Sequence, residues 1–346
     1  MKSPMPRILS AWVMCCLMPA CAEPREEQDP ATAPTGASVG ASATDSPSTS
    51  SATGPTSGDG DASDTERLDI APAPDVASGD GCDAVDLLFV IDNSASMGTY
   101  QQALADAFPT FIDQVFATLP TGVSVHIGVT TTDFWCTPES CECAESTLAC
   151  QTDASLAEVE AHYAPPTSGD NGTNGGQGRL YVYDGLPFFE TSTDDDPAAV
   201  TAWFSGAATG AGEQGCSFEM PVAAAGYVAH PSNEATNAGF IRDEGAVLLV
   251  FFLTDEPDKS PEPTATYLES FLAAKAECGG ADCVISGGLI PSCVSEINQK
   301  SWQFLEGVSN EPVWSDITDV NAYPSVVGDA LSVAVTDLCE TIVPAG

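Results

Sequence analysis

The sequence has very few basic residues. Nine lysines and arginines and three histidines stand against 50 aspartates and glutamates, so the 346-residue chain has a formal net charge of −41 at pH 7. From residue 81 onward, 38 acidic residues face five basic ones. Such a surface repels phosphate backbones and attracts cations, so the composition argues against any nucleic-acid partner.

The N-terminal region lacks an apolar stretch long enough to remain as a membrane-spanning helix. Two basic residues precede a short apolar run at 8–18, a pattern typical of a secretory signal peptide. Its end, LMPAC at 17–21, resembles a bacterial lipobox, which implies a lipid on Cys21. The alternative is an ordinary signal peptide cleaved near Ala22. We therefore expect an exported outer-membrane or cell-surface lipoprotein that meets the membrane only through this anchor, with the periplasmic side as the alternative location.

Large apolar side chains are almost absent from residues 22–80. This segment consists mainly of Ser, Thr, Ala, Gly, Pro and Asp and cannot bury enough apolar surface to fold. The sequence therefore predicts three parts: a signal peptide with a lipobox-like end at 1–21, a disordered acidic linker at 22–80, and a folded domain at 81–346.

Thirteen cysteines are many for a cytosolic protein and ordinary for an exported one. Ten remain beyond the signal peptide, which allows up to five disulfides in an oxidising compartment. Zinc is the alternative for the cluster at 136–150, although its spacing lacks paired Cys-x2-Cys knuckles. Cys82 and Cys339 flank the predicted first strand and last helix, and we guess that they pair.

A buried strand that runs into a polar loop organises the domain. Residues 87–91 form a continuous apolar run, the pattern of a parallel strand covered on both faces. Asp92 follows at the carboxyl end, where open α/β sheets place ligand-binding groups. Ser94 and Ser96 add two hydroxyls to the same loop. Carboxylate and hydroxyl oxygens together suit magnesium, calcium or manganese.

A second apolar strand, Ala246–Leu253, also ends next to an acid, Asp255. In a doubly wound sheet of order 3-2-1-4-5-6, strands 1 and 4 are neighbours at the topological switch point. We therefore expect the carboxylates of Asp92 and Asp255 to face one another although they are far apart in sequence.

The remaining segments give an alternating α/β pattern. A helix is predicted at Tyr100–Thr118, with a kink or break at Pro109. Further strands are predicted at 123–130, 179–183, 284–290 and 313–317, and further helices at 197–204, from 215 onward, at 267–272, at 302–305 and at 326–342.

Asp92-Asn93-Ser94-Ala95-Ser96, with its preceding strand, resembles the first motif of the von Willebrand factor type A domain, and the strand before Asp255 resembles the last. The resemblance covers roughly residues 82–342. It implies a doubly wound, mostly parallel central sheet with helices on both faces; the cysteines at 136–150 predict a disulfide-bearing insertion after the second strand.

The same resemblance implies a metal-ion-dependent adhesion site for Mg2+ (or Ca2+ or Mn2+). Ser94 and Ser96 would bind the cation directly, while Asp92 and Asp255 would act directly or through water. The family uses a threonine for a third hydroxyl; this chain has no clean equivalent, so Ser217 is the candidate and Thr209 the reserve. An acidic side chain from a protein partner would complete the coordination.

Two other function classes stay open. A metal-dependent phosphoesterase or hydrolase is one, although haloacid-dehalogenase-type phosphatases need a second aspartate where this chain has Ser94. No Gly-x-Ser-x-Gly nucleophile elbow is present, and the three histidines are interpreted as packed or surface residues, so no catalytic residue is expected. An envelope structural protein with a non-functional metal loop is the other class.

Overall fold

The computed structural model describes residues 83–134, 160, 163, 165–166, 173–215, 218–292, 299–308 and 312–333. All of them belong to one unit, Ala77–Gly346. The predicted signal peptide, Cys21, the linker and the cysteine cluster at 136–150 lie outside the described residues, as does the guessed pair of Cys82 and Cys339. Within the described ranges, no helix is long and apolar enough to cross a membrane.

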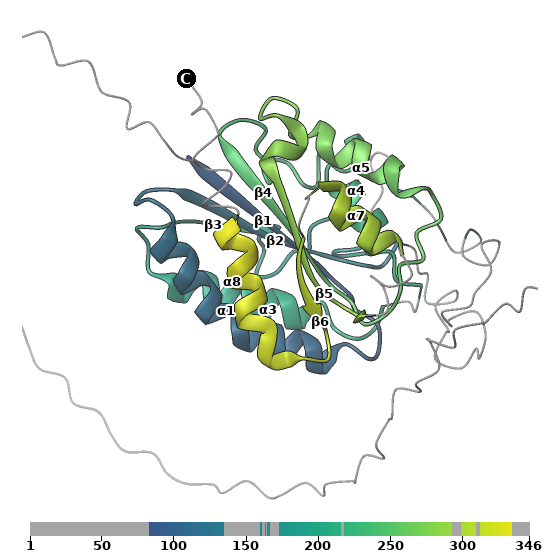
Figure 1. Ribbon diagram of the computed structural model, residues 1–346, viewed down its shortest axis with the longest axis horizontal. Helices are drawn as coiled ribbons and strands as arrows, with labels where there is room; N and C mark the ends of the chain where they lie inside the picture. Colours follow the sequence, from purple (N-terminus) through teal and green to yellow (C-terminus); the bar gives the residue numbers. More distant parts are fainter. Residues whose placement is uncertain are drawn as a thin grey trace, which may run out of the picture. The chain divides into compact units, whose positions relative to one another are not determined.

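Six strands form one sheet in the order β3-β2-β1-β4-β5-β6 (Figure 1). All neighbours are parallel except β2 and β3, which are antiparallel. Every residue of β1, β4 and β5 is buried, in keeping with their mainly apolar sequences. The predicted doubly wound α/β class is confirmed. The strands are β1 (Ala84–Ile91), β2 (Ser124–Thr131), β3 (Phe188–Ser192), β4 (Ala246–Leu253), β5 (Val284–Ile290) and β6 (Val313–Asp316).

The third strand differs from the prediction at 179–183. That segment lies beside the end of β2, where the Tyr181 N–H donates to Val129 O over 2.7 Å, but it is not a strand of the sheet. A tight turn follows, with positive φ at Asp184 (49°) and Gly185 (79°). Because this turn reverses the chain, the next residues, Phe188–Ser192, pair with β2 in the antiparallel sense.

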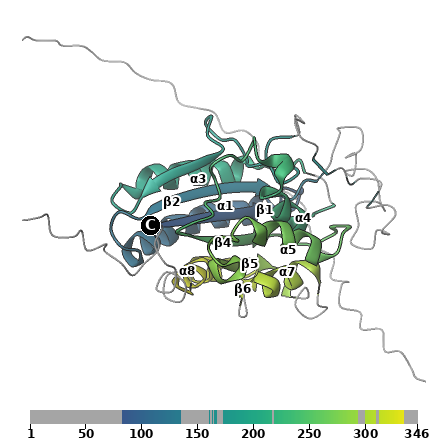
Figure 2. The same ribbon diagram turned by 90° about the horizontal axis from the view of Figure 1, so that it is seen from above.

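Helices cover both faces of the sheet, as Figures 1 and 2 show. One layer packs on the face that carries Phe89, and the other on the face that carries Leu88. The first layer consists of α1 (Gly98–Thr118), α3 (Pro197–Gly210) and α8 (Tyr323–Val333), and the second of α4 (Pro221–Val228), α5 (Thr264–Ala273) and α7 (Lys300–Val308). Three 3-10 helices, η2 (Pro231–Asn233), η3 (Gly280–Cys283) and η4 (Val320–Ala322), complete the described elements.

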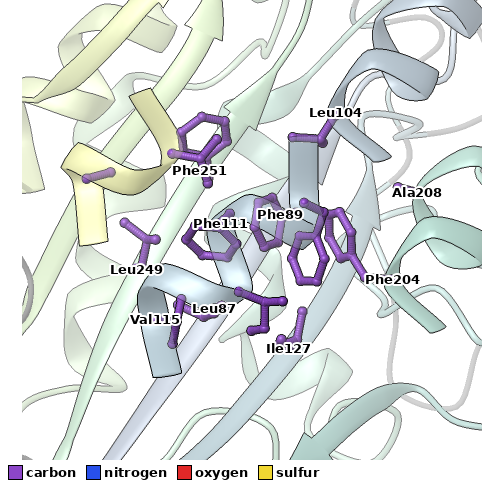
Figure 3. Close-up of a cluster of buried hydrophobic side chains, with 14 of the residues drawn as sticks. Leu87, Phe89, Leu104, Phe111, Val115, Ile127, Phe204, Ala208, Leu249 and Phe251 are labelled. Carbon is purple, nitrogen blue, oxygen red and sulfur yellow. The ribbon is translucent and has the colours of Figure 1, made fainter. Parts of the chain in front are cut away.

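Aromatic side chains fill the layer between the sheet, α1 and α3 (Figure 3). Phe89 of β1 points into this layer, with its ring centroid 4.6 Å from that of Phe204 and 6.1 Å from that of Phe111. Phe204 of α3 stacks on Phe108 of α1 at 3.7 Å and 17°. This packing fixes α1, and with it the loop that joins β1 to α1.

Two helix predictions differ in their details. Pro109 lies inside α1, which runs without a break through it, and the proline is on the exposed side of the helix. The last predicted helix, 326–342, is observed as α8 from Tyr323 to Val333, and residues beyond 333 lie outside the described part of the chain.

A buried ion pair ties the amino ends of the strands together. Asp86 of β1 is fully buried, and its Oδ1 lies 2.6 Å from a terminal guanidinium nitrogen of Arg242. The Arg242 backbone N–H donates to the other carboxylate oxygen over 2.8 Å. Burial raises the pKa of Asp86, and the charge and hydrogen bonds of Arg242 oppose that rise. At the edge opposite to the Asp92 loop, Arg242 therefore offsets part of the cost of burying the Asp86 carboxylate.

The structure contains a disulfide between Cys278 and Cys283. It closes a short loop between α5 and β5, a different part of the sequence from the insertion predicted after the second strand. The disulfides expected in that insertion stay a prediction, since its cysteines lie outside the described residues.

Candidate functional site

The candidate site lies where β1, β2 and β4 end. Ile91, the last residue of β1, is in register with Thr131 of β2 on one side and Leu253 of β4 on the other. The next residue is also held to β4, since the Asp92 N–H donates to Leu253 O over 2.8 Å. The strand order runs from β1 to β2 and β3 on one side and continues with β4 on the other. The edge between β1 and β4 is therefore the topological switch point, where open α/β sheets bind ligands.

Asp92 is completely buried at this edge. Its Oδ1 accepts from the Ser94 N–H over 2.8 Å, and its Oδ2 accepts from the Thr254 hydroxyl over 2.8 Å. Burial, and then the charge of Asp255, raise the pKa of Asp92 to about 7, against these hydrogen bonds. A buried carboxylate whose strongest charged neighbour is another carboxylate is electrostatically suited to bind a cation.

Ser94 and Ser96 present adjacent hydroxyls on the same loop. Their Oγ atoms are 3.2 Å apart, and Ser94 is buried while Ser96 is exposed. The loop is anchored behind them because Met97, which follows, is fully buried. Gln101 of α1 holds the loop further, since its side-chain amide donates to Asp92 O and to Gly212 O, each over 2.8 Å.

Asp255 stands beside this loop from the end of β4. It is half-buried, and its Oδ1 is a buried atom with no hydrogen-bond partner among the described residues. Burial raises its pKa, while a hydrogen bond from Ser96 lowers it. The structure thus brings together four of the five predicted site residues: Asp92, Ser94, Ser96 and Asp255.

The third hydroxyl is not located. Ser217 lies outside the described residues. Thr209 is near the end of α3, and its hydroxyl donates to Ser205 O over 2.7 Å, one turn back in the same helix. The helix predicted to open at 215 begins later, at Pro221, a residue suited to the first turn of a helix.

Sequence reasoning missed Thr254 and Gln101. Thr254 is buried, and its hydroxyl fixes one oxygen of Asp92, while Gln101 fixes the backbone of the same residue. Their positions offered a weak signal, because Thr254 directly precedes Asp255 and Gln101 lies in the first turn of α1. Which atoms they would contact depends on the register between β1 and β4.

Three charged side chains border the site. The ammonium of Lys259 lies 2.6 Å from a carboxylate oxygen of Glu219 and 2.6 Å from one of Glu256. Burial lowers the pKa of Lys259, but the charges of both glutamates raise it more, so this lysine is an ammonium ion. A single positive charge is therefore shared by two carboxylates, and the surroundings of Asp92 and Asp255 stay negative.

Buried oxygens without partners accumulate at this edge. Within the described part of the chain, four buried side-chain oxygens at this edge lack a hydrogen-bond partner, on Asn93, Thr132, Glu219 and Asp255. Each such atom costs about 1–3 kcal/mol, so the cluster fits a hard cation with bound water. No three Asp, Glu, His or Cys side chains in the described ranges converge as a metal site; hydroxyls and water would supply the other ligands.

No family model and no curated protein matches this sequence. Among solved structures, the chain is similar to proximal thread matrix protein 1 from the mussel byssus, with a TM-score of 0.37 and 13% identity over 72% of this chain and 48% of that one. It is also similar to a von Willebrand factor type A protein from Catenulispora acidiphila, with a TM-score of 0.35 and 12% identity over 72% of this chain and 43% of that one. A third similar structure is the pilus adhesin SpaC from Lactobacillus rhamnosus GG, with a TM-score of 0.36 and 12% identity over 72% of this chain and 30% of that one.

The chain spans less than half the length of each of these three proteins. At such TM-scores and identities the likeness carries no argument about function. The fold class of this chain rests on its own strand order and register, and its function on the residues gathered at the carboxyl edge.

Proposed function

We propose that this protein is a membrane-tethered, divalent-cation-dependent protein-binding module of the von Willebrand factor type A kind. The observation that carries the proposal is the convergence of Asp92 and Asp255 with the hydroxyls of Ser94 and Ser96 at one sheet edge. The charge that acts most strongly on the buried carboxylate of Asp92 is the negative charge of Asp255. A bound cation would therefore relieve an electrostatic cost that the fold otherwise bears.

The cation we propose is Mg2+, with Ca2+ or Mn2+ as alternatives. Ser94 and Ser96 would hold it directly, Ser217 would add a third hydroxyl, and Asp92 and Asp255 would act directly or through water. When bound, the ion supplies an incompletely compensated positive charge at the surface. An acidic side chain of a protein partner is the ligand that such a charge favours.

The tether is proposed from the N-terminal sequence. Lipidation of Cys21 would place the chain at the outer membrane or cell surface. The linker at 22–80 would separate the anchor from the domain by roughly 38–46 Å on average, if it behaves as a random coil. Such a tether holds a binding module near the membrane without fixing its orientation.

Capture of a partner from an envelope extract tests this function. The full chain is immobilised, loaded in Mg2+ and then washed with a chelator. We expect the wild-type protein to release its partner on chelation and Ser94→Ala to retain none. Thr236→Ala is the matched control, because that exposed residue is not among the candidate ligands and its hydroxyl donates to Asn233 O over 2.9 Å. Retention that is insensitive both to chelator and to Ser94→Ala would refute cation dependence.

The surroundings of Lys259 disfavour the phosphoesterase alternative. This lysine is the basic residue nearest to Asp255 in sequence, and its ammonium already contacts Glu219 and Glu256. An enzyme that transfers a phosphoryl group needs a positive charge free to stabilise that group. Hydrolysis of a generic phosphate ester that is lost in Asp92→Ala would favour the enzyme. Partner binding that ignores chelator would favour a structural protein with a non-functional loop.

A further inference from the structure

Glu219 is held at the same sheet edge by contacts with two strand ends. The N–H of the next residue, Met220, donates to Thr132 O just beyond β2 over 3.2 Å. The carbonyl of Glu219 itself accepts from the Lys259 N–H over 2.8 Å, in the loop that follows β4. Its backbone is therefore fixed between the ends of β2 and β4, the strands on either side of Asp92.

The Glu219 carboxylate is only half satisfied. The side chain is fully buried, and its Oε2 accepts from the Lys259 ammonium over 2.6 Å. Its Oε1 is also buried but has no hydrogen-bond partner among the described residues. Burial, followed by the charge of Asp92, raises the pKa of Glu219 well above its usual range. The free oxygen thus belongs to a carboxylate that interacts electrostatically with the centre of the candidate site.

Lys259 explains how the fold tolerates this carboxylate. An unpaired buried carboxylate would cost several kcal/mol, and the lysine offsets that cost through one oxygen only. The lysine also contacts Glu256 over 2.6 Å. The second oxygen of Glu219 is therefore available to another positive or proton-donating group.

We propose that Glu219 is an outer carboxylate of the cation site, whose Oε1 accepts a hydrogen bond from a water molecule bound to the cation while Lys259 holds Oε2. An outer position agrees with the absence, in the described ranges, of three acidic side chains close enough to hold an ion by themselves. The inference rests on the proposed function, because it needs a cation beside Asp92. Removing an outer partner of this kind typically weakens metal binding by about 10–100-fold.

Titration of the full chain with Mn2+, followed by the electron paramagnetic resonance of the free ion, tests the assignment. We expect Glu219→Gln to weaken Mn2+ binding by at least about tenfold. Glu256→Gln is the matched control. It also removes one negative charge that contacts Lys259, but Glu256 has no unpartnered buried oxygen. We expect that control to change the affinity by less than about threefold, the size of a modest electrostatic effect.

The outcomes separate the two claims. If the wild-type protein binds Mn2+ and Glu219→Gln binds it with equal affinity, the role of Glu219 is overturned and the cation site is retained. No Mn2+ binding by the wild-type protein would overturn the proposed function itself. Thermal melting in chelator shows whether each variant is folded. If Glu219→Gln fails to fold, Glu219→Asp keeps the charge but is too short to reach both groups, and unchanged Mn2+ affinity in that variant would equally overturn the assignment.

Discussion

Replacing Asp258 by asparagine is expected to remove a defined pH dependence from the stability of the fold. Asp258 is buried in the loop after β4, and its Oδ2 accepts from the Val222 N–H and the Ser260 hydroxyl, each over 2.9 Å. Its Oδ1 accepts from the Ser260 N–H over 2.9 Å. The carboxylate therefore caps the first turn of α4 and links the loop that carries Asp255 to the helix that follows Glu219.

The magnitude follows from the pKa of Asp258. Burial raises it from 3.8 to about 6, while the hydrogen bonds and the charge of Lys300 oppose the rise. Because the pKa is higher in the folded state, the folded protein binds this proton more tightly. The resulting stabilisation is fully present below about pH 4 and is lost as the pH rises through about 6. At about 1.4 kcal/mol per pKa unit, the loss is about 3 kcal/mol.

Denaturant unfolding of the wild-type chain and of Asp258→Asn, at several pH values between 4 and 8 in metal-free buffer, measures this loss. Other titrating groups are common to both proteins and cancel in the difference. We expect the wild-type unfolding free energy to fall by about 3 kcal/mol relative to the variant over this range. Two curves that stay parallel to within about 1 kcal/mol, less than one pKa unit, would refute the reasoning.

Three further predictions concern the fold and its anchor. Arg242→Met removes the guanidinium partner of the buried Asp86 carboxylate and leaves the His126 imidazole, 3.6 Å from Oδ1, as its remaining ion-pair partner among the described residues. We expect this change to lower the unfolding free energy by about 3–5 kcal/mol; a loss below about 1 kcal/mol, as for an exposed pair, would contradict the role given to this contact. Phe204→Ala removes the ring stacked on Phe108 and should cost about 3–5 kcal/mol in denaturant unfolding, whereas a cost under about 1 kcal/mol would place that ring outside the core. Cys21→Ala should move the protein from the membrane fraction to the soluble fraction, and unchanged fractionation would count against lipidation.

Sequence reasoning predicted the sheet best where its signals were local. The bounds of β4 and β5 agree with the apolar runs at 246–253 and 284–290. The order of the six strands also agrees with the expectation, because the parallel strands and their crossover helices leave few arrangements open. The position of Asp92 beside the end of β4 follows from these features alone.

The third strand shows where local signals were misleading. The aromatic and apolar residues at 179–183 favoured a strand, yet they precede a turn at Asp184 and Gly185. Asp-Gly is a strong turn sequence, and weighing it would have moved the strand to 188–192. For α1, the helical spacing on both sides of Pro109 correctly predicted one helix, and the break expected at the proline is not observed.

The side chains behind the site could not be deduced from the sequence. Asp92 and Thr254 are joined by a hydrogen bond although they are 162 residues apart. The pairing of Glu219 with Lys259 depends on how two loops meet beyond the sheet edge. Buried polar contacts of this kind follow from register and loop conformation, for which no periodic pattern exists in the chain.

Calorimetric titration of Mg2+ into the full chain tests the central claim most directly, with Asp92→Ala as the site variant and Thr236→Ala as the control. We predict that the wild-type protein and Thr236→Ala bind one ion with similar affinity. Asp92→Ala should bind none while its circular dichroism spectrum is unchanged. Equal Mg2+ affinity in all three proteins, or no binding by the wild-type chain, would contradict a cation site at the edge shared by β1 and β4.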